Sequence, residues 1–176
     1  MKTLVLGLGN DLLGDDAVGI EAARRLRREV GESADVVESS QHGLALIDCM
    51  LGYNRMIILD AITTGKHPPG TVLSIEPDEL TSVPGPSPHY SGLPEITALA
   101  GQLRLGFPSD IRIIAVEILD RTQIGHSLSP AVATALPELI DKVKAILQGW
   151  QGHQTRPGKA PRSHEPTVKR RGSVTK

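Results

Sequence analysis

The stretch that decides the fold is residues 4–30, which read LVLGLGNDLLGDDAVGIEAARRLRREV. An apolar run at residues 4–6 passes into the glycines and asparagine of residues 7–10, a pattern that predicts a strand followed by a loop. Between about residue 17 and residue 30, apolar side chains recur at four-residue spacing, at Val18, Ala22, Leu26 and Val30. This spacing predicts a helix with one apolar face. The chain thus opens with a strand–loop–helix unit, the repeating unit of α/β proteins.

The same alternation continues along the chain. Further strands are predicted at residues 35–39, 56–59, 71–76 and 111–119, and further helices at residues 43–51, 93–105 and 129–148, with Gly149 just past the end of the last one. The segment 56–59 (MIIL) is apolar on both faces, as is typical of a central parallel strand covered by helices on each side. The segment 71–76 is less apolar, and we expect it near an edge. These patterns predict a three-layer α-β-α sandwich with a mostly parallel five-stranded sheet.

Charge is distributed unevenly over the 176 residues. Residues 1–148 hold 12 Lys and Arg against 19 Asp and Glu, whereas residues 149–176 hold seven Lys and Arg against one Glu. The last segment is also poor in apolar residues, which is typical of disorder. We therefore expect one α/β domain over residues 1–149 and a basic, disordered tail over residues 150–176. An acidic body lacks the basic face that nucleic-acid binding needs.

Composition excludes several other classes of protein. Cys49 is the only cysteine, so an internal disulfide framework and a cysteine-based zinc or iron–sulfur site are excluded. No apolar run approaches the roughly 18 residues of a membrane span. The first apolar run is too short for the core of a signal peptide, so we expect a cytoplasmic protein.

Polar residues follow three of the predicted strands, where the crevice of an open α/β sheet forms its sites. Asp15 and Asp16 come after the first strand, His42 after the second and Asp60 after the third. Parallel strands would bring these side chains to one rim. The glycine-rich loop before Asp15 does not match a nucleotide-binding motif, because the dinucleotide fingerprint requires glycine where Leu12 stands and a P-loop requires Lys-Ser/Thr after its last glycine.

Carboxylates clustered at such a rim suit a cation. Asp16, Asp60 and His89 together would form an O/O/N donor set for a borderline divalent metal such as nickel or zinc. Structural roles remain open for each residue. One of the two adjacent acids, Asp15 in particular, is expected only to cap or charge-stabilise the helix that follows. Asp60 could accept bonds from loop amides, and His89 alone could be an ordinary loop histidine.

The segment Gly9-Asn10-Asp11-Leu12-Leu13-Gly14-Asp15-Asp16-Ala17-Val18-Gly19 resembles the signature of the hydrogenase maturation endopeptidases, Gly-Asn-x-Leu-x-x-Asp-Asp/Glu-x-x-Gly. The order of later segments resembles the same family: Leu59-Asp60-Ala61, Ser87-Pro88-His89 and Gly125-His126-Ser127-Leu128-Ser129-Pro130. The resemblance implies an α/β hydrolase. Its catalytic and metal-recognising residues would be Asp16, Asp60 and His89.

The resemblance also implies a function. Such an enzyme removes the C-terminal extension of a nickel-iron hydrogenase large-subunit precursor after nickel insertion. The nickel, with its thiolates, would belong to the substrate, so no resident organic cofactor is expected. The nickel-loaded precursor is the expected partner of a monomeric enzyme that binds neither nucleic acid nor membrane. The alternatives are a non-catalytic nickel-sensing maturation chaperone and a nucleotide-binding module. His42, where relatives carry a Gly-Thr turn, is expected to be solvated, and the family resemblance does not explain the basic tail.

Overall fold

β1 (Thr3–Leu8) lies inside a five-stranded sheet, and all six of its residues are buried. The protein is described by a computed structural model for residues 1–77, 79, 89, 93–120, 122–125 and 127–154. The other strands are β2 (Asp35–Ser39), β3 (Arg55–Ile62), β4 (Val72–Ile75) and β5 (Asp110–Glu117), in the order β2-β1-β3-β5-β4. All neighbouring pairs are parallel except β4 with β5, which is antiparallel and places β4 at the edge. The predicted mostly parallel sheet is confirmed.

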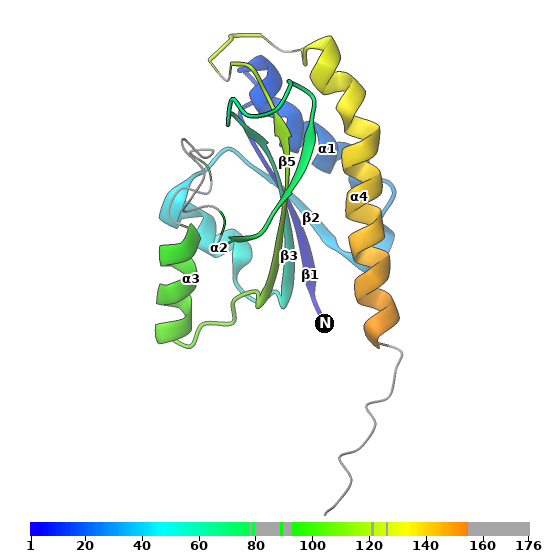
Figure 1. Cartoon of the computed structure of the whole chain (residues 1–176). Helices are drawn as coiled ribbons and strands as arrows, with labels where there is room; N and C mark the ends of the chain where they lie inside the picture. Colours follow the sequence, from blue (N-terminus) through cyan, green and yellow to red (C-terminus); the bar gives the residue numbers. More distant parts are fainter. Residues whose placement is uncertain (78, 80–88, 90–92, 121, 126, 155–176) are drawn as a thin grey trace, which may run out of the picture.

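Helices cover both faces of this sheet (Figure 1). On one face lie α1 (Val18–Leu26) and α4 (Pro130–Gln154). On the other lie α2 (Ile47–Met50), which continues a 3₁₀ turn at Gly43–Leu46, and α3 (Leu93–Gln102). The predicted three layers are therefore confirmed. Within the described part of the chain, no helix has both the length and the apolar composition of a membrane span.

The central strands supply both cores, because successive side chains of a strand point to opposite faces. Val5 and Ile57 pack in the core beneath α1 and α4, and Leu4 and Ile58 pack in the core beneath α2 and α3. Both cores are built mainly from aliphatic side chains, as the composition requires. This two-sided burial explains why β3 is apolar along most of its length.

Two glycines set the distance between α1 and the sheet. A Cβ on Gly19, inside α1, would lie 2.3 Å from the carbonyl oxygen of Leu59 and 2.4 Å from that of Leu8. A Cβ on Gly7, in β1, would lie 2.4 Å from the carbonyl oxygen of Gly19. The absence of both side chains lets α1 rest directly on β1 and β3. This close packing holds the start of the helix over the carboxyl ends of those strands.

Several element boundaries differ from the predicted ones. The helix predicted at residues 17–30 is a 3₁₀ turn (Gly14–Ala17) followed by α1, which ends at Leu26. β3 is longer than predicted, because its pairing with β5 continues through Ile62. Asp60 therefore lies within β3 and not after it. The last helix continues past Gly149 to Gln154, and residues 155–176 of the predicted tail lie outside the described residues.

Candidate active site

The candidate site lies at the carboxyl ends of the parallel strands. Asp16 sits in the 3₁₀ turn after β1, where its backbone N–H donates to the carbonyl oxygen of Leu13 at 2.8 Å. Asp60 is in β3, and His89 belongs to the segment between β4 and α3. All three side chains are buried, Asp60 completely. Three predicted site residues from distant parts of the sequence are thus polar groups inside the protein, where a charge needs a partner.

Asp16 and His89 are in contact. The Nε2 atom of His89 lies 3.4 Å from Oδ2 of Asp16, and its Nδ1 atom lies 3.3 Å from the backbone carbonyl oxygen of Gln41. A carbonyl oxygen can only accept, so Nδ1 carries the proton that is donated to Gln41. The carbonyl of Gln41 therefore fixes the ring orientation and directs Nε2 toward Asp16, as second-shell groups orient metal-binding histidines.

Asp60 joins this pair through its charge. Burial alone would lower the pKa of His89, but the hydrogen bond to Asp16 and the negative charge of Asp60 outweigh it and raise that pKa above its ordinary value. Oδ1 of Asp60 accepts a hydrogen bond from the backbone N–H of Ala61 at 2.7 Å. Two carboxylates therefore stabilise the imidazolium form of His89. Asp16 is in contact with the ring, and Asp60 contributes through electrostatic attraction.

Two carboxylates and one imidazole are a donor set suited to a borderline divalent cation. In the described part of the chain, no group of three His, Cys, Asp or Glu side chains is already arranged as a metal site. The structure thus brings Asp16 and His89 into contact and places Asp60 within electrostatic reach. In its imidazolium form, His89 must release the proton on Nε2 before that nitrogen can bind a metal, because only the neutral nitrogen is a ligand.

Asp15 has a structural role. Its Oδ1 accepts a hydrogen bond from the backbone N–H of Ser129 at 2.6 Å, directly before α4 begins at Pro130. A carboxylate at the N-terminus of a long helix satisfies a free amide and interacts favourably with the helix dipole. The expectation that Asp15 stabilises a helix is confirmed, but the hydrogen bond is to α4 and not to the helix that follows it in sequence.

Sequence reasoning missed Glu117, a fourth buried acid at this rim. One carboxylate oxygen accepts from the backbone N–H groups of Thr64 and Gly65, at 2.7 and 2.8 Å, and the other accepts from the Thr64 hydroxyl at 2.7 Å. These bonds fix the loop that follows β3. The sequence signal that could have identified Glu117 is an acidic residue near the end of an apolar strand. The same signal identified Asp60.

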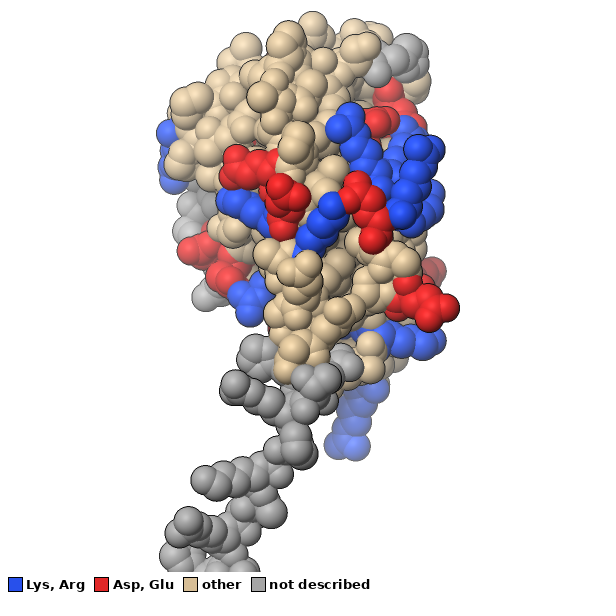
Figure 2. Space-filling view, turned by 90° about the vertical axis from the view of Figure 1, so that its right-hand side faces the viewer, with Lys and Arg blue, Asp and Glu red and all other residues tan. Residues whose placement is uncertain are grey.

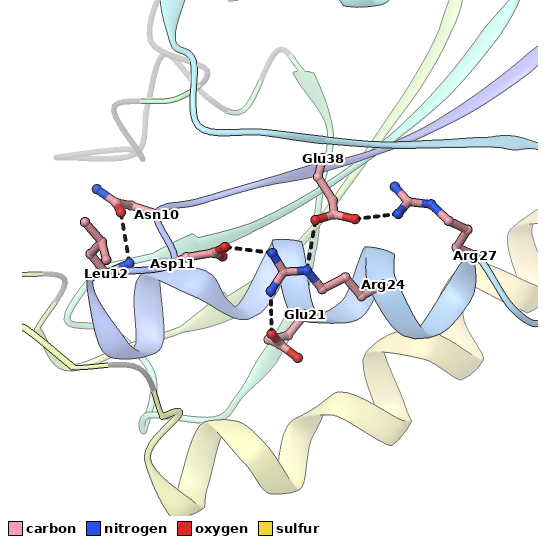
Figure 3. Close-up of polar contacts among 7 residues, drawn as sticks. All are labelled: Asn10, Asp11, Leu12, Glu21, Arg24, Arg27 and Glu38. Carbon is pink, nitrogen blue, oxygen red and sulfur yellow. Dashed lines mark hydrogen bonds and ion pairs between the residues drawn. The ribbon is translucent and has the colours of Figure 1, made fainter.

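Arg24 organises the outer side of the rim (Figure 3). Its guanidinium group contacts the carboxylates of Asp11, Glu21 and Glu38, at 2.7, 2.9 and 2.9 Å. The hydrogen bonds to Asp11 and Glu21 are the main reason that its pKa is raised. Asp11 belongs to the loop after β1 and Glu38 to β2, so one side chain connects two neighbouring segments of the site. His42 beyond β2 is exposed, as expected.

Comparison with known proteins identifies the class to which this fold and rim belong. The model of the family described as "Hydrogenase maturation protease" matches residues 20–146, most of the chain. The matched stretch includes Asp60 and His89 and begins just after the 3₁₀ turn that carries Asp16. The chain belongs to the hydrogenase maturation protease family, and it is a peptidase.

Individual relatives agree with this assignment. The hydrogenase 2 maturation protease of Escherichia coli is 28% identical over 152 residues, which cover 84% of this chain and 92% of that protein. The hydrogenase expression/formation protein HupD of Rhizobium leguminosarum bv. viciae is 28% identical over 154 residues, covering 85% and 75%. Among solved structures, the hydrogenase maturating endopeptidase HybD from E. coli superposes with a TM-score of 0.74 at 27% identity, covering 85% of this chain and 94% of that one.

Proposed function

We propose that this peptidase removes the C-terminal extension of a nickel-iron hydrogenase large-subunit precursor once nickel has been inserted, and that it recognises the nickel through Asp16, Asp60 and His89. The observation that carries the proposal is the buried contact between Asp16 and His89 in the field of Asp60. Two carboxylates and an imidazole at one rim form a set of hard and borderline donors. The family membership supplies the class of reaction, and this donor set supplies the recognition element.

The precursor's nickel would enter the site as part of the substrate. His89 would release its Nε2 proton to solvent, and the freed nitrogen lone pair would bind the metal while Nδ1–H stays on the carbonyl oxygen of Gln41. The carboxylates of Asp16 and Asp60 would then face the metal in place of the imidazolium. An unloaded precursor offers no cation to replace that positive charge, so it would bind more weakly. This exchange makes processing conditional on nickel insertion.

Bound nickel would hold the adjacent polypeptide next to the carboxylates and could also polarise the scissile carbonyl. Peptide hydrolysis then needs a water molecule activated at the rim. Cys49 lies in α2 beneath the other face of the sheet, packed against that core. An acyl-enzyme route through Cys49 is therefore not proposed.

The test is a processing assay with purified precursor, with and without nickel. The wild-type chain should produce the mass loss of the C-terminal extension only from loaded precursor. Asp16→Ala, Asp60→Ala and His89→Ala should each reduce the rate by at least about a hundredfold, the usual size of losses at catalytic or metal-orienting groups. His67→Ala, which removes an exposed histidine beyond β3, is the matched control and should process normally.

Full processing by Asp16→Ala would overturn the assigned site. Equal processing of loaded and unloaded precursor would overturn nickel recognition while leaving the peptidase intact. Tight binding of loaded precursor by the wild type without any mass loss would favour the non-catalytic chaperone instead.

A further inference from the structure

Several large apolar side chains are exposed on the loops that border the candidate site, and two of them lie on loops that are hydrogen-bonded to each other. Leu12, in the loop after β1, is 59% exposed, and Ile124, in the connection between β5 and α4, is 87% exposed. Single exposed apolar residues are common on proteins and need no explanation. Leu12 and Ile124 differ from such scattered residues because the backbone segments that carry them lie side by side. Leu12 also lies only four residues before Asp16 in the sequence.

The backbone contacts between the two loops form a short parallel bridge. The N–H of Gly125 donates to the carbonyl oxygen of Leu12 at 3.0 Å, and the N–H of Gly14 donates to the carbonyl oxygen of Gly125 at 2.8 Å. Leu12 and Ile124 therefore flank the same hydrogen-bonded junction. Asp15 adds a third connection between the same segments through its bond to Ser129. The backbone segments that carry the two apolar side chains are thus fixed relative to each other.

The turn that carries Leu12 is also fixed on its other side (Figure 3). The side-chain oxygen of Asn10 accepts from the N–H of Leu12 at 3.0 Å, and Asp11 is held by Arg24 at 2.7 Å. In the close-up, Leu12 extends away from the cluster of charges around Arg24. A side chain presented on a rigid turn loses little conformational freedom when it is covered, so this arrangement favours binding.

Charged side chains are sparse over much of this end of the molecule. Asp11 is held by Arg24, which it shares with Glu21 and Glu38, and the end of the molecule that carries the β5–α4 connection is largely free of Lys, Arg, Asp and Glu in the face shown in Figure 2. A polar or charged ligand would find few partners there. An apolar segment of polypeptide is the chemistry that fits.

We propose that Leu12 and Ile124 form an apolar platform that receives the precursor's polypeptide next to the scissile bond through its bulky apolar side chains. The proposal rests on the proposed function and names a substrate contact that the metal-recognising residues do not provide. The occupant follows from position, because a peptide substrate held at Asp16 extends about 3.3–3.6 Å per residue and reaches the preceding turn within a few residues. The platform would add affinity for polypeptide to affinity for nickel.

The test measures steady-state processing of nickel-loaded precursor by Leu12→Ser, Ile124→Ser and the double variant. Each single change should raise KM about tenfold with kcat little altered, since a tenfold change corresponds to 1.4 kcal/mol and lies just below the range for burying one such side chain. Leu103→Ser is the matched control, because Leu103 is 60% exposed and follows α3 at the opposite end of the molecule (Figure 1). It should leave both constants unchanged.

A crosslinking experiment identifies the occupant directly. A benzophenone amino acid at position 12 should form a photoadduct with the precursor, and the same group at position 103 should not. Thermal unfolding of each variant checks that these exposed changes leave the fold intact. An unchanged KM for the double variant, with normal wild-type processing, overturns the platform and leaves the proposed function standing. Adducts with a second copy of this chain instead of the precursor also overturn it. Failure of the wild type to process loaded precursor overturns the proposed function and the platform with it.

Discussion

Replacing Gly19 by alanine sets two physical effects against each other. Gly19 lies inside α1, and alanine is favoured over glycine in a helix interior by about 1 kcal/mol. The added Cβ, however, would lie 2.3 Å and 2.4 Å from two backbone carbonyl oxygens, whereas carbon–oxygen contacts normally lie at about 3.3 Å or more. Those oxygens belong to β1 and β3, the central strands. The helix and not the sheet must therefore move, by about 1 Å.

Such a shift weakens the packing of the whole apolar face of α1. Val18, Ala22 and Leu26 are completely buried against the sheet and α4. A gap of about 0.5–1 Å forfeits a quarter to a half of the dispersion attraction, and overpacking typically costs about 1–3 kcal/mol. At a rigid backbone contact we expect the upper part of this range or slightly more. After the helix preference is subtracted, Gly19→Ala should lower the free energy of unfolding by about 2–3 kcal/mol.

Urea denaturation at 25 °C measures this difference, and Gly149→Ala is the matched control. Gly149 also lies inside a helix, α4, and, apart from its chain neighbours and the backbone of its own helix, no heavy atom of the described residues lies within 4 Å of the position its Cβ would take. Its replacement should raise the free energy of unfolding by up to about 1 kcal/mol. The two substitutions should therefore have opposite signs. A Gly19→Ala protein as stable as the wild type would refute the steric reasoning. Gly19→Ala should also slow precursor processing beyond its loss of folded protein, because Asp16 lies in the 3₁₀ turn that leads directly into α1.

Three further predictions concern the acids and the histidine at the rim. Asp15→Ala should destabilise the fold by about 2 kcal/mol, because it removes a charge-assisted hydrogen bond from the backbone N–H of Ser129. Amide hydrogen exchange at the start of α4 should then accelerate, and unchanged exchange there would contradict the role of Asp15 as a cap of α4. Glu117→Ala should cost about 2–4 kcal/mol in urea denaturation, because three partly buried hydrogen bonds lose their buried acceptor, and a loss below about 0.5 kcal/mol would contradict that role. NMR titration should place the pKa of His89 above 6.5, and Asp16→Asn should lower it. The raised pKa means that His89 stabilises the fold fully below pH 6.5, and that this contribution is lost as the pH rises through the folded pKa.

The fold could be predicted because the main helices and strands each show a recognisable spacing of apolar residues in the sequence. β2 begins and ends where the sequence pattern places it, and segment 71–76 contains the edge strand β4. β3 was predicted too short because the apolar pattern stops at Asp60, while its backbone pairing with β5 continues to Ile62. The end of α4 was misplaced at Gly149, because a glycine that would end an isolated helix is tolerated where the helix continues to pack. Trp150, the next residue, packs against the core and accepts a hydrogen bond from Arg55.

The site could be predicted only in part. The carboxyl ends of parallel strands indicated the rim, which is a property of topology. The contact between Asp16 and His89, however, joins residues 73 positions apart, and it depends on the backbone carbonyl of Gln41, whose direction no residue pattern encodes. For the same reason, neither the bond of Asp15 to Ser129 nor that of Glu117 to Thr64 was visible in the sequence.

The acidic residues at the rim fall into two groups, according to the hydrogen-bond donors that their carboxylates face. Asp15 and Glu117 accept from backbone N–H groups of other loops, and Asp11 faces the guanidinium of Arg24, so each of these carboxylates connects two segments. Asp16 and Asp60 instead both interact electrostatically with the imidazole of His89, a group that can release its proton. The loop-connecting acids must stay bonded for the rim to keep its shape, whereas in the proposed function the positive charge of His89 beside Asp16 and Asp60 is replaced by nickel. If the proposed function holds, stability and recognition depend on different carboxylates of one rim, and substitutions in the two groups should separate unfolding free energy from processing rate.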